Sequence, residues 1–192
     1  MKLRSSRWKL AERRGHEKNY RWSLQVIDWQ VIIKKHGPAV WQTAYRLLGN
    51  HADAADCFQE TFVSALDFCR RQRVRNFSGL LARLATTRAI DQLRRRFRRA
   101  RSETDFEGCS AVQSENPCPS QKAQQKELTT MLRKSLSELP PQEAQVFCLR
   151  YLNDMSYRQI ANELDIKTNT AGVLLHRARA KLRKSFELSA KE

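Results

Sequence analysis

Glycine and proline are scarce in this chain, with 6 and 5 residues among 192. Turn-rich β folds need both residue types at regular intervals, and long stretches without them favour helices. Hydrophobic residues make up 41% of the chain, which is slightly below the usual share for a globular domain. The length therefore suits one ordinary domain or two small ones, and we expect an all-α fold.

Metal-binding and membrane-spanning patterns are also missing. The five cysteines lack CxxC spacing, and the four histidines do not stand near them at ligand spacing, so we expect no metal and no cofactor. An odd cysteine count favours a reducing, cytoplasmic location. Apolar runs such as Val31–Ile33 fall far short of the ~20 residues that cross a bilayer, so we expect no stable membrane insertion. Cys109 and Cys118 share a polar segment, and both a redox role and idle thiols stay open for them.

Positive charge is what the chain has in excess. Lys and Arg number 36 against 20 Asp and Glu, a net charge of +16. Such an excess favours a polyanionic partner, because neutralised phosphates release their condensed counterions. A soluble protein with many solvated cations is the alternative that charge alone leaves open.

Composition divides the chain into segments. Residues 1–21 are polar and basic and predict a flexible extension, and residues 22–101 show helical periodicity. Residues 102–126 begin with an acidic, Ser- and Pro-containing stretch that is typical of a flexible linker. Helical periodicity returns over 127–186, and 187–192 form a tail. We therefore expect two small helical domains of about four helices each.

Local signals set the expected helix ends in the first domain. Gly37–Pro38 is expected to stop one helix and start another, and Gly49–Asn50 to stop the next. Asp53 is a candidate N-cap for the helix that follows. A further helix is expected from about Ser78.

The second domain contains a predicted helix-turn-helix. Pro140–Pro141 forbids continuation of one helix. Ser156 starts another with capping-box spacing to Gln159, and a tight turn at 165–167 leads to a longer helix that Thr168 can cap. Five apolar residues of that helix recur on one face, at helical spacing: Ala171, Leu174, Leu175, Ala178 and Leu182.

The opposite face of this last helix is suited to DNA. It presents small or hydrogen-bonding groups near its N-terminus and cations further along: Asn169, Val173, His176, Arg177, Ala180, Arg183 and Lys184. A recognition helix needs this order, with base edges met first and phosphates later. The alternative is an amphipathic helix whose basic face is simply solvated.

These segments resemble the fourth domain of sigma-70 family factors. The matching residues are Leu139–Glu143, Leu149–Leu152, Ser156–Ala161 and His176–Arg179. The resemblance implies binding of the duplex promoter -35 element by Asn169, Thr170, Gly172, Val173, His176 and Arg177, and we add Arg183 and Lys184 as phosphate contacts. Leu174 stands where the family usually has a basic residue, and the periodicity places it toward the core.

The amino-terminal half is similar to the same family in two further places. Asp53–Phe62 resembles the segment that docks on bacterial core RNA polymerase, which implies a contact through Asp53, Asp56, Gln59 and Glu60. Phe77–Arg96 resembles the segment that captures the -10 element as single-stranded DNA. That match implies roles for Arg83, Thr87, Arg88, Arg94, Arg95 and Arg96. Leu80 and Thr87 stand where the family commonly has Trp and Asn.

The short linker implies a subgroup. It cannot hold the extra helical domain of larger sigma factors, so the chain resembles the extracytoplasmic-function (ECF) group. The resemblance implies a non-enzymatic initiation subunit with core RNA polymerase and promoter DNA as partners. No further domain follows Glu192, so we expect regulation by a separate anti-sigma factor.

Three other functions compete with this interpretation. A conventional helix-turn-helix regulator would bind its operator tightly without polymerase. An enzyme is disfavoured, since the sequence has no Gly-rich phosphate loop, nucleophile-base pairing or carboxylates at metal spacing. An RNA-binding scaffold is disfavoured by the acidic linker and the well-formed helix-turn-helix.

Overall fold

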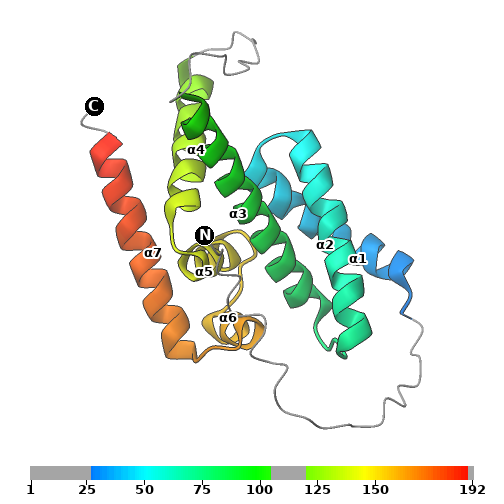
Figure 1. The fold of residues 1–192 in the computed structure, drawn as a ribbon. Helices are drawn as coiled ribbons and strands as arrows, with labels where there is room; N and C mark the ends of the chain where they lie inside the picture. The colour runs from blue at the N-terminus through cyan, green and yellow to red at the C-terminus, as the bar shows by residue number, and fades with distance from the viewer. Residues whose placement is uncertain (1–26, 105–119, 190–192) are drawn as a thin grey trace, which may run out of the picture.

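The computed structural model describes residues 27–104 and 120–189, and over these ranges the chain forms helices joined by short loops, with no strands (Figure 1). The helices, in order, are α1 (Trp29–Leu48), α2 (His51–Arg71), α3 (Phe77–Thr104), α4 (Ser120–Glu138), α5 (Pro141–Tyr151), α6 (Tyr157–Leu164) and α7 (Thr168–Ser189). We call α1–α3 the first unit and α4–α7 the second unit. The predicted extension 1–21, the end of the tail and most of the predicted linker, with Cys109 and Cys118, lie outside the described residues.

Helix α1 runs straight through Gly37–Pro38, so the predicted break is wrong. Asp28 caps the helix by accepting hydrogen bonds from the backbone N–H groups of Gln30 (3.0 Å) and Val31 (3.2 Å). A proline within a helix loses one backbone hydrogen bond. Packing of α1 on α2 and α3 outweighs that loss, because Gly37 is buried, with Phe58 beside it. The first unit therefore has three helices among the described residues, where about four were expected.

The junction between α1 and α2 follows the predicted stop but not the predicted cap. Gly49 ends α1 in the left-handed conformation, with φ at 78°. Asn50, and not Asp53, caps α2: its Oδ1 accepts from the Asp53 backbone N–H at 2.7 Å. The Asn50 Nδ2 also donates to Asp53 Oδ2 at 2.6 Å. Asn50 is the cap because Gly49 turns the chain immediately before it, and Asp53 then lies within the first helical turn.

Helix α3 is the longest element and begins one residue before the expected Ser78. Asn76 accepts from the Gly79 backbone N–H at 3.1 Å and so caps its start. Residues 102–104, which the sequence assigned to the linker, belong to α3, and residues 120–126 belong to α4. The first unit closes around a buried cluster that α1, α2 and α3 share: Val40, Phe62, Ala65, Leu81 and Ala85.

The second unit confirms most of the local predictions. Helix α5 begins at Pro141, and Ser156 forms the predicted capping box with Gln159. Asp165 makes the turn after α6 with a φ of 52°. Thr168 is the first residue of α7 and not its cap, because the carbonyl of Lys167 accepts from the Ala171 N–H at 3.1 Å. All five apolar residues predicted to face inward from α7 are buried.

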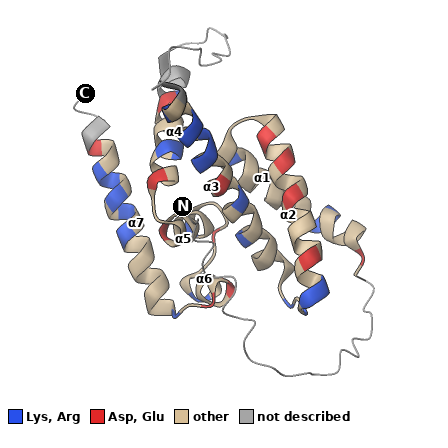
Figure 2. Ribbon diagram, in the orientation of Figure 1, with Lys and Arg blue, Asp and Glu red and all other residues tan. Residues whose placement is uncertain are grey.

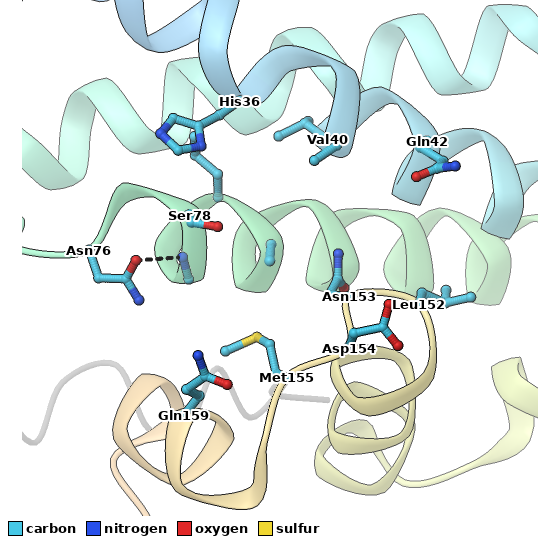
Figure 3. Close-up of a pocket in the computed structure, with 14 residues that line it drawn as sticks. His36, Val40, Gln42, Asn76, Ser78, Leu152, Asn153, Asp154, Met155 and Gln159 are labelled. Atoms are coloured by element: carbon cyan, nitrogen blue, oxygen red, sulfur yellow. Dashed lines mark hydrogen bonds between the residues drawn. The ribbon is translucent and has the colours of Figure 1, made fainter.

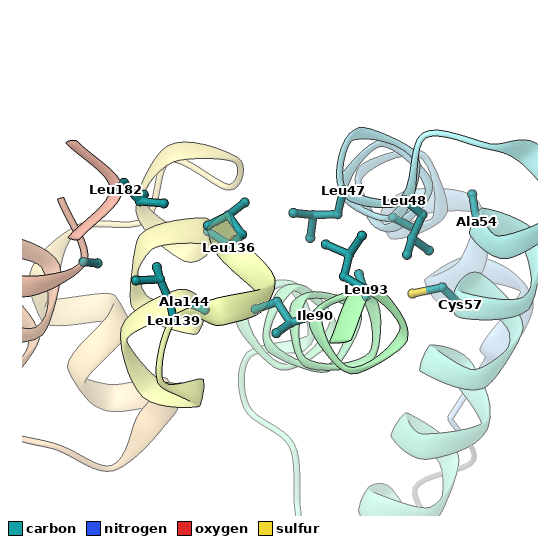
Figure 4. Close-up of a cluster of buried hydrophobic side chains, with 14 residues drawn as sticks. Leu47, Leu48, Ala54, Cys57, Ile90, Leu93, Leu136, Leu139, Ala144 and Leu182 are labelled. Atoms are coloured by element: carbon teal, nitrogen blue, oxygen red, sulfur yellow. The ribbon is translucent and has the colours of Figure 1, made fainter. Parts of the chain in front are cut away.

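The two units pack against each other through α3. One buried cluster contains Leu47 and Leu48 of α1, Ile90 and Leu93 of α3, and residues of the second unit: Leu136, Leu139, Ala144, Cys148, Ala178 and Leu182. Figure 4 shows the α1 and α3 leucines on one side and Leu136, Leu139 and Leu182 on the other. The core of this chain is therefore continuous from one unit to the other.

Candidate nucleic-acid interface

The outer face of α7 is exposed from Asn169 to Lys184. Every residue of the predicted -35 set is exposed to solvent except Gly172, which is half-buried; the set is Asn169, Thr170, Gly172, Val173, His176, Arg177, Arg183 and Lys184. Leu174, by contrast, is only 9% exposed. The periodicity argument thus predicted both faces of α7 correctly, including the inward position of Leu174.

Two apolar side chains stand at the amino-terminal end of this face. Val173 of α7 is 49% exposed and Tyr157 of α6 is 41% exposed. Both line a shallow hollow with the side chains of Asn169 and Arg177. An added Cβ at Gly172 would meet no atom within 4 Å, so the surface there is open to a ligand.

Contacts from the other helices of the second unit fix the position of α7. Lys181 forms an ion pair with Glu143 of α5 at 2.9 Å, and only 7% of the Glu143 side chain is exposed. The Ser135 and Ser185 hydroxyls lie 2.7 Å apart and join α4 to α7. Removing one partner of a buried ion pair leaves an uncompensated charge. The Glu143 carboxylate therefore holds α7 against α5 at a defined register.

Charge is segregated over the described helices. Figure 2 shows Lys and Arg along the carboxyl-terminal half of α7 and along the end of α3, whereas Asp and Glu recur along α2. Asp56, Gln59 and Glu60 of α2 are exposed, on the side away from Phe62. Asp53 is half-buried and held by Asn50, so three of the four predicted polymerase contacts share one open face.

The residues predicted to capture single-stranded DNA share helix α3 but not one free surface. Arg95 and Arg96 are exposed, and Arg96 reaches the Leu48 carbonyl at 3.4 Å. Arg88 donates to the Ser64 hydroxyl at 2.8 Å. Arg83 lies over the Phe68 ring at 5.5 Å, in cation–π geometry. These hydrogen bonds and the cation–π contact stay within the first unit, whereas the charge of Arg83 also acts on the Glu163 carboxyl of α6.

Thr87 and Arg94 instead contact the second unit. The Thr87 hydroxyl accepts from Nε2 of Gln145 at 2.7 Å. Arg94 donates to the carbonyls of Ser137 at 3.2 Å and Leu139 at 2.7 Å. Burial lowers the pKa of the Arg94 guanidinium from its ordinary value. Sequence patterns gave no signal for these pairings, which join residues far apart in the chain.

A polar cleft between the units was also not predicted. It has a volume of about 320 Å³ and is lined by α1, α3, α6 and the loop after α5 (Figure 3). Beside it, Asn76 donates to Glu163 at 2.7 Å, and burial raises the pKa of the Glu163 carboxyl. The Nδ2 of Asn153 donates to the Thr43 hydroxyl at 2.8 Å. The interface between the two units is thus partly polar.

The described residues offer no sign of metal or thiol chemistry. No group of three or more His, Cys, Asp or Glu side chains in 27–104 and 120–189 has the arrangement to hold a metal ion. Burial raises the pKa of Cys57 to about 11 and of Cys148 to about 12, so both thiols stay protonated near neutral pH. Across the same part of the chain, none of the helices has the length and apolar content of a membrane span.

Two family models match the chain in order. The model described as Sigma-70 region 2 covers residues 32–99, which are α1 to most of α3. The model described as Sigma-70, region 4 covers residues 129–182, which include α5, α6 and most of α7. The chain belongs to the sigma-70 family. Each match falls on one structural unit, as the resemblance of the motifs implied.

Curated relatives place this sigma-70 family chain in the ECF group. It is 34% identical over 156 residues to the ECF RNA polymerase sigma factor SigE of Mycolicibacterium smegmatis, a match covering 81% of this chain and 60% of SigE. It is 28% identical over 162 residues to the ECF RNA polymerase sigma factor SigW of Bacillus subtilis, covering 81% of this chain and 87% of SigW. This chain therefore spans less than two thirds of the length of SigE.

Solved structures share the fold. The sigma factor RpoE of Bartonella quintana, crystallised with the anti-sigma factor NepR, has a TM-score of 0.51 at 20% identity, covering 83% of this chain and 97% of RpoE. CnrH, solved in complex with the cytosolic domain of CnrY, has a TM-score of 0.52 at 22% identity, and the match covers 85% of this chain and 89% of CnrH. These likenesses support the all-α, two-unit architecture.

Proposed function

We propose that this chain is an ECF-type sigma factor, a non-catalytic subunit that binds bacterial core RNA polymerase and directs promoter recognition and transcription initiation. The observation that carries the proposal is the order of the two sigma-70 matches, each on its own helical unit. The exposed faces of α2 and α7 supply surfaces of opposite charge that suit a protein partner and DNA, respectively. Since both proposed partners are found in the bacterial cytoplasm, we propose that the chain acts there.

The proposed mechanism divides the work between the units. The face of α2 with Asp56, Gln59 and Glu60 docks on core polymerase. Helix α7 enters the major groove of the duplex -35 element, with Val173, His176 and Arg177 toward the bases and Arg183 and Lys184 toward phosphates. Helix α3 follows the single-stranded -10 element through its arginines and Thr87. Polymerase holds both units at a fixed separation, which raises the effective concentration of the second contact once the first has formed.

A separate anti-sigma protein is the proposed regulator. RpoE and CnrH were both solved with a partner, which for RpoE is the anti-sigma factor NepR. Their shared fold with this chain supports a comparable partner.

Reconstitution tests the function as a whole. We expect the purified chain to bind bacterial core RNA polymerase and to direct new transcript starts on a genomic promoter library, while binding duplex promoter DNA weakly on its own. Sequencing of the transcript 5′ ends gives the readout. Tight binding to one operator without polymerase, and no new starts with it, would favour a conventional helix-turn-helix regulator instead.

Reversing charge on α2 should weaken polymerase binding. Asp56→Arg places a cation where the proposed partner surface is basic, and we expect at least about tenfold weaker binding to core. Asp67→Arg is the matched control, because Asp67 is an exposed carboxylate on the same helix and lies beyond the predicted contact segment. Affinity is measured by competition for core polymerase. Equal losses in both variants would contradict the assignment of the contact to 53–60.

Removing cations from α7 should weaken upstream recognition without affecting polymerase binding. In the double variant Arg177→Ala, Lys184→Ala, loss of the base contact of Arg177 should weaken promoter binding by about 1–3 kcal/mol. Loss of the phosphate contact of Lys184 should reduce the slope of log affinity against log salt concentration by about one. Binding of the holoenzyme to promoter DNA is titrated at several salt concentrations. Lys134→Ala, an exposed cation on α4, is the matched control. Loss of core binding as well would indicate unfolding and not a lost contact.

Val173 should read a thymine methyl group. Its exposed isopropyl group lines a shallow hollow on the outer face of α7, and apolar contact with the C5 methyl is how side chains recognise thymine in the major groove. Replacing each thymine of the -35 element in turn by deoxyuridine should weaken holoenzyme binding about fourfold at one position, the effect of one buried methylene-sized group. Val173→Ala should cause a similar loss and show no further loss on that deoxyuridine DNA. Val63→Ala, an exposed valine on α2, is the control.

A further inference from the structure

Three cations of α7 stand at regular helical spacing. Arg177, Lys181 and Lys184 are separated by four and three residues, so they lie along one flank of the helix. In the proposed function Arg177 and Lys184 contact DNA, and Lys181 stands between them. Spacing alone therefore predicts an unbroken row of three cations along a phosphate backbone.

The structure removes the middle cation from this row. Nζ of Lys181 lies 3.0 Å from Oε1 and 2.9 Å from Oε2 of Glu143, in the first turn of α5. Arg177 and Lys184 are exposed, and neither forms an ion pair within the part of the chain that the structure describes. The charge of Lys181 is thus matched inside the second unit, whereas the charges on either side of it face solvent.

Burial ties Lys181 to its partner. Only 7% of the Glu143 side chain is exposed, against 51% of the Lys181 side chain. Apart from the ion pair, Oε2 of Glu143 is buried with no hydrogen-bond partner among the described residues. Departure of Lys181 would leave this buried charge uncompensated, which is strongly destabilising. A phosphate at the DNA surface is already accompanied by counterions, so it competes poorly with Glu143 for Lys181.

Apolar packing fixes the side of α7 on which the pair forms. Ala178 and Leu182 of α7 are 0% and 5% exposed, and they share a buried cluster with Ala144 of α5. The two charged residues directly precede Leu182 and Ala144 in the chain. A rotation of α7 that carried Lys181 toward DNA would expose this apolar surface. The ion pair therefore belongs to the packed face of α7.

We propose that Glu143 is a positioning residue for the -35 contact, which withdraws Lys181 from the phosphate backbone and so limits the affinity of α7 for DNA of any sequence. The proposal rests on the duplex-binding role of α7 in the proposed function. A phosphate contact carries no sequence information and strengthens binding to every duplex alike. Non-specific sites in a genome far outnumber promoters, so one phosphate contact fewer leaves more of the protein free for promoters.

Counterion release gives the size of the effect. Each phosphate that a protein neutralises steepens the slope of log affinity against log salt concentration by about 0.9. Freeing Lys181 should steepen the slope by this amount. The gain in affinity over the wild-type chain should then shrink about three- to fourfold between about 50 and 200 mM salt. A variant that is merely less stable loses affinity and gains no salt-dependent contact.

Glutamine replacements change the charges and keep side chains that form hydrogen bonds. Glu143→Gln frees Lys181 from its carboxylate partner. Lys181→Gln keeps an amide donor for the buried Glu143 carboxylate, so the carboxylate is not left without a partner. The double variant Glu143→Gln, Lys181→Gln removes both charges and therefore releases no cation.

Two control variants complete the set. Lys184→Gln removes an exposed cation from the same flank of α7, and it should lose one phosphate contact. Glu138→Gln, at an exposed carboxylate at the end of α4, raises the net charge of the chain by one, as Glu143→Gln does. Glu138 forms no ion pair among the described residues, so its replacement releases no paired cation.

The test titrates the holoenzyme, which is the full chain bound to bacterial core RNA polymerase, with promoter duplex at several salt concentrations. The titration is repeated on the same duplex with a scrambled -35 element. We expect Glu143→Gln to steepen the slope by about 0.9 on both duplexes, and Lys184→Gln to reduce it by about 0.9 on the promoter. Lys181→Gln, the double variant and Glu138→Gln should keep the wild-type slope.

Two results would overturn the proposal. One is an unchanged slope for Glu143→Gln while Lys184→Gln reduces it. The other is a reduced slope for Lys181→Gln, because Lys181 would then contact a phosphate in the wild-type chain. If Glu143→Gln loses helicity by circular dichroism, Lys181→Gln alone decides. Failure of the proposed function would appear differently, as a lack of core polymerase binding or as an unchanged slope for Lys184→Gln.

Discussion

The packing of α3 between the two units is the constraint on which the rest of the structure depends. Ala85 and Ala89 of α3 are fully buried, and such small residues let neighbouring helices come close. Further along, Ile90 and Leu93 belong to a cluster that includes residues of α4 and α5. One helix thus builds the core of the first unit and provides the docking surface for the second. Its polar side chains must divide accordingly between solvent, first-unit partners and second-unit partners.

The elements that could be predicted from sequence are those set by contacts within a few residues. The capping box at Ser156, the start of α5 at Pro141 and the buried stripe of α7 follow from i, i+3 and i, i+4 spacing. The errors arose where a local signal was overridden, in one case by packing and in the other by a neighbouring cap. Gly37–Pro38 resembles a helix boundary, yet packing of α1 on α2 and α3 continues the helix through it. Asp53 resembles a cap, yet Asn50 three residues earlier takes that role.

The candidate site likewise has one part that the sequence could predict and one part that it could not. The outer face of α7 was predictable, because it lies opposite a clear stripe of apolar residues. Burial of that stripe leaves the opposite face exposed to solvent. The partners of Thr87 and Arg94 were not predictable, because Gln145 and Leu139 lie 58 and 45 residues further along the chain. Periodicity states which side of α3 is polar. It cannot state that the same side meets a second helical unit, since that depends on how the units pack.

This difference bears on how a basic helix is interpreted. A run of arginines such as Arg94–Arg96 indicates affinity for phosphate only to the extent that the cations face solvent, and here the first of them caps the carbonyls at the end of α4. Desolvation lowers the pKa of Arg94, but a guanidinium remains protonated, so the buried charge must keep its carbonyl partners or be given new ones. A phosphate backbone is a stronger acceptor for that charge than two carbonyls are. The position of Arg94 in an arginine run therefore does not by itself make it a phosphate contact, because phosphates would first have to replace the carbonyls of Ser137 and Leu139.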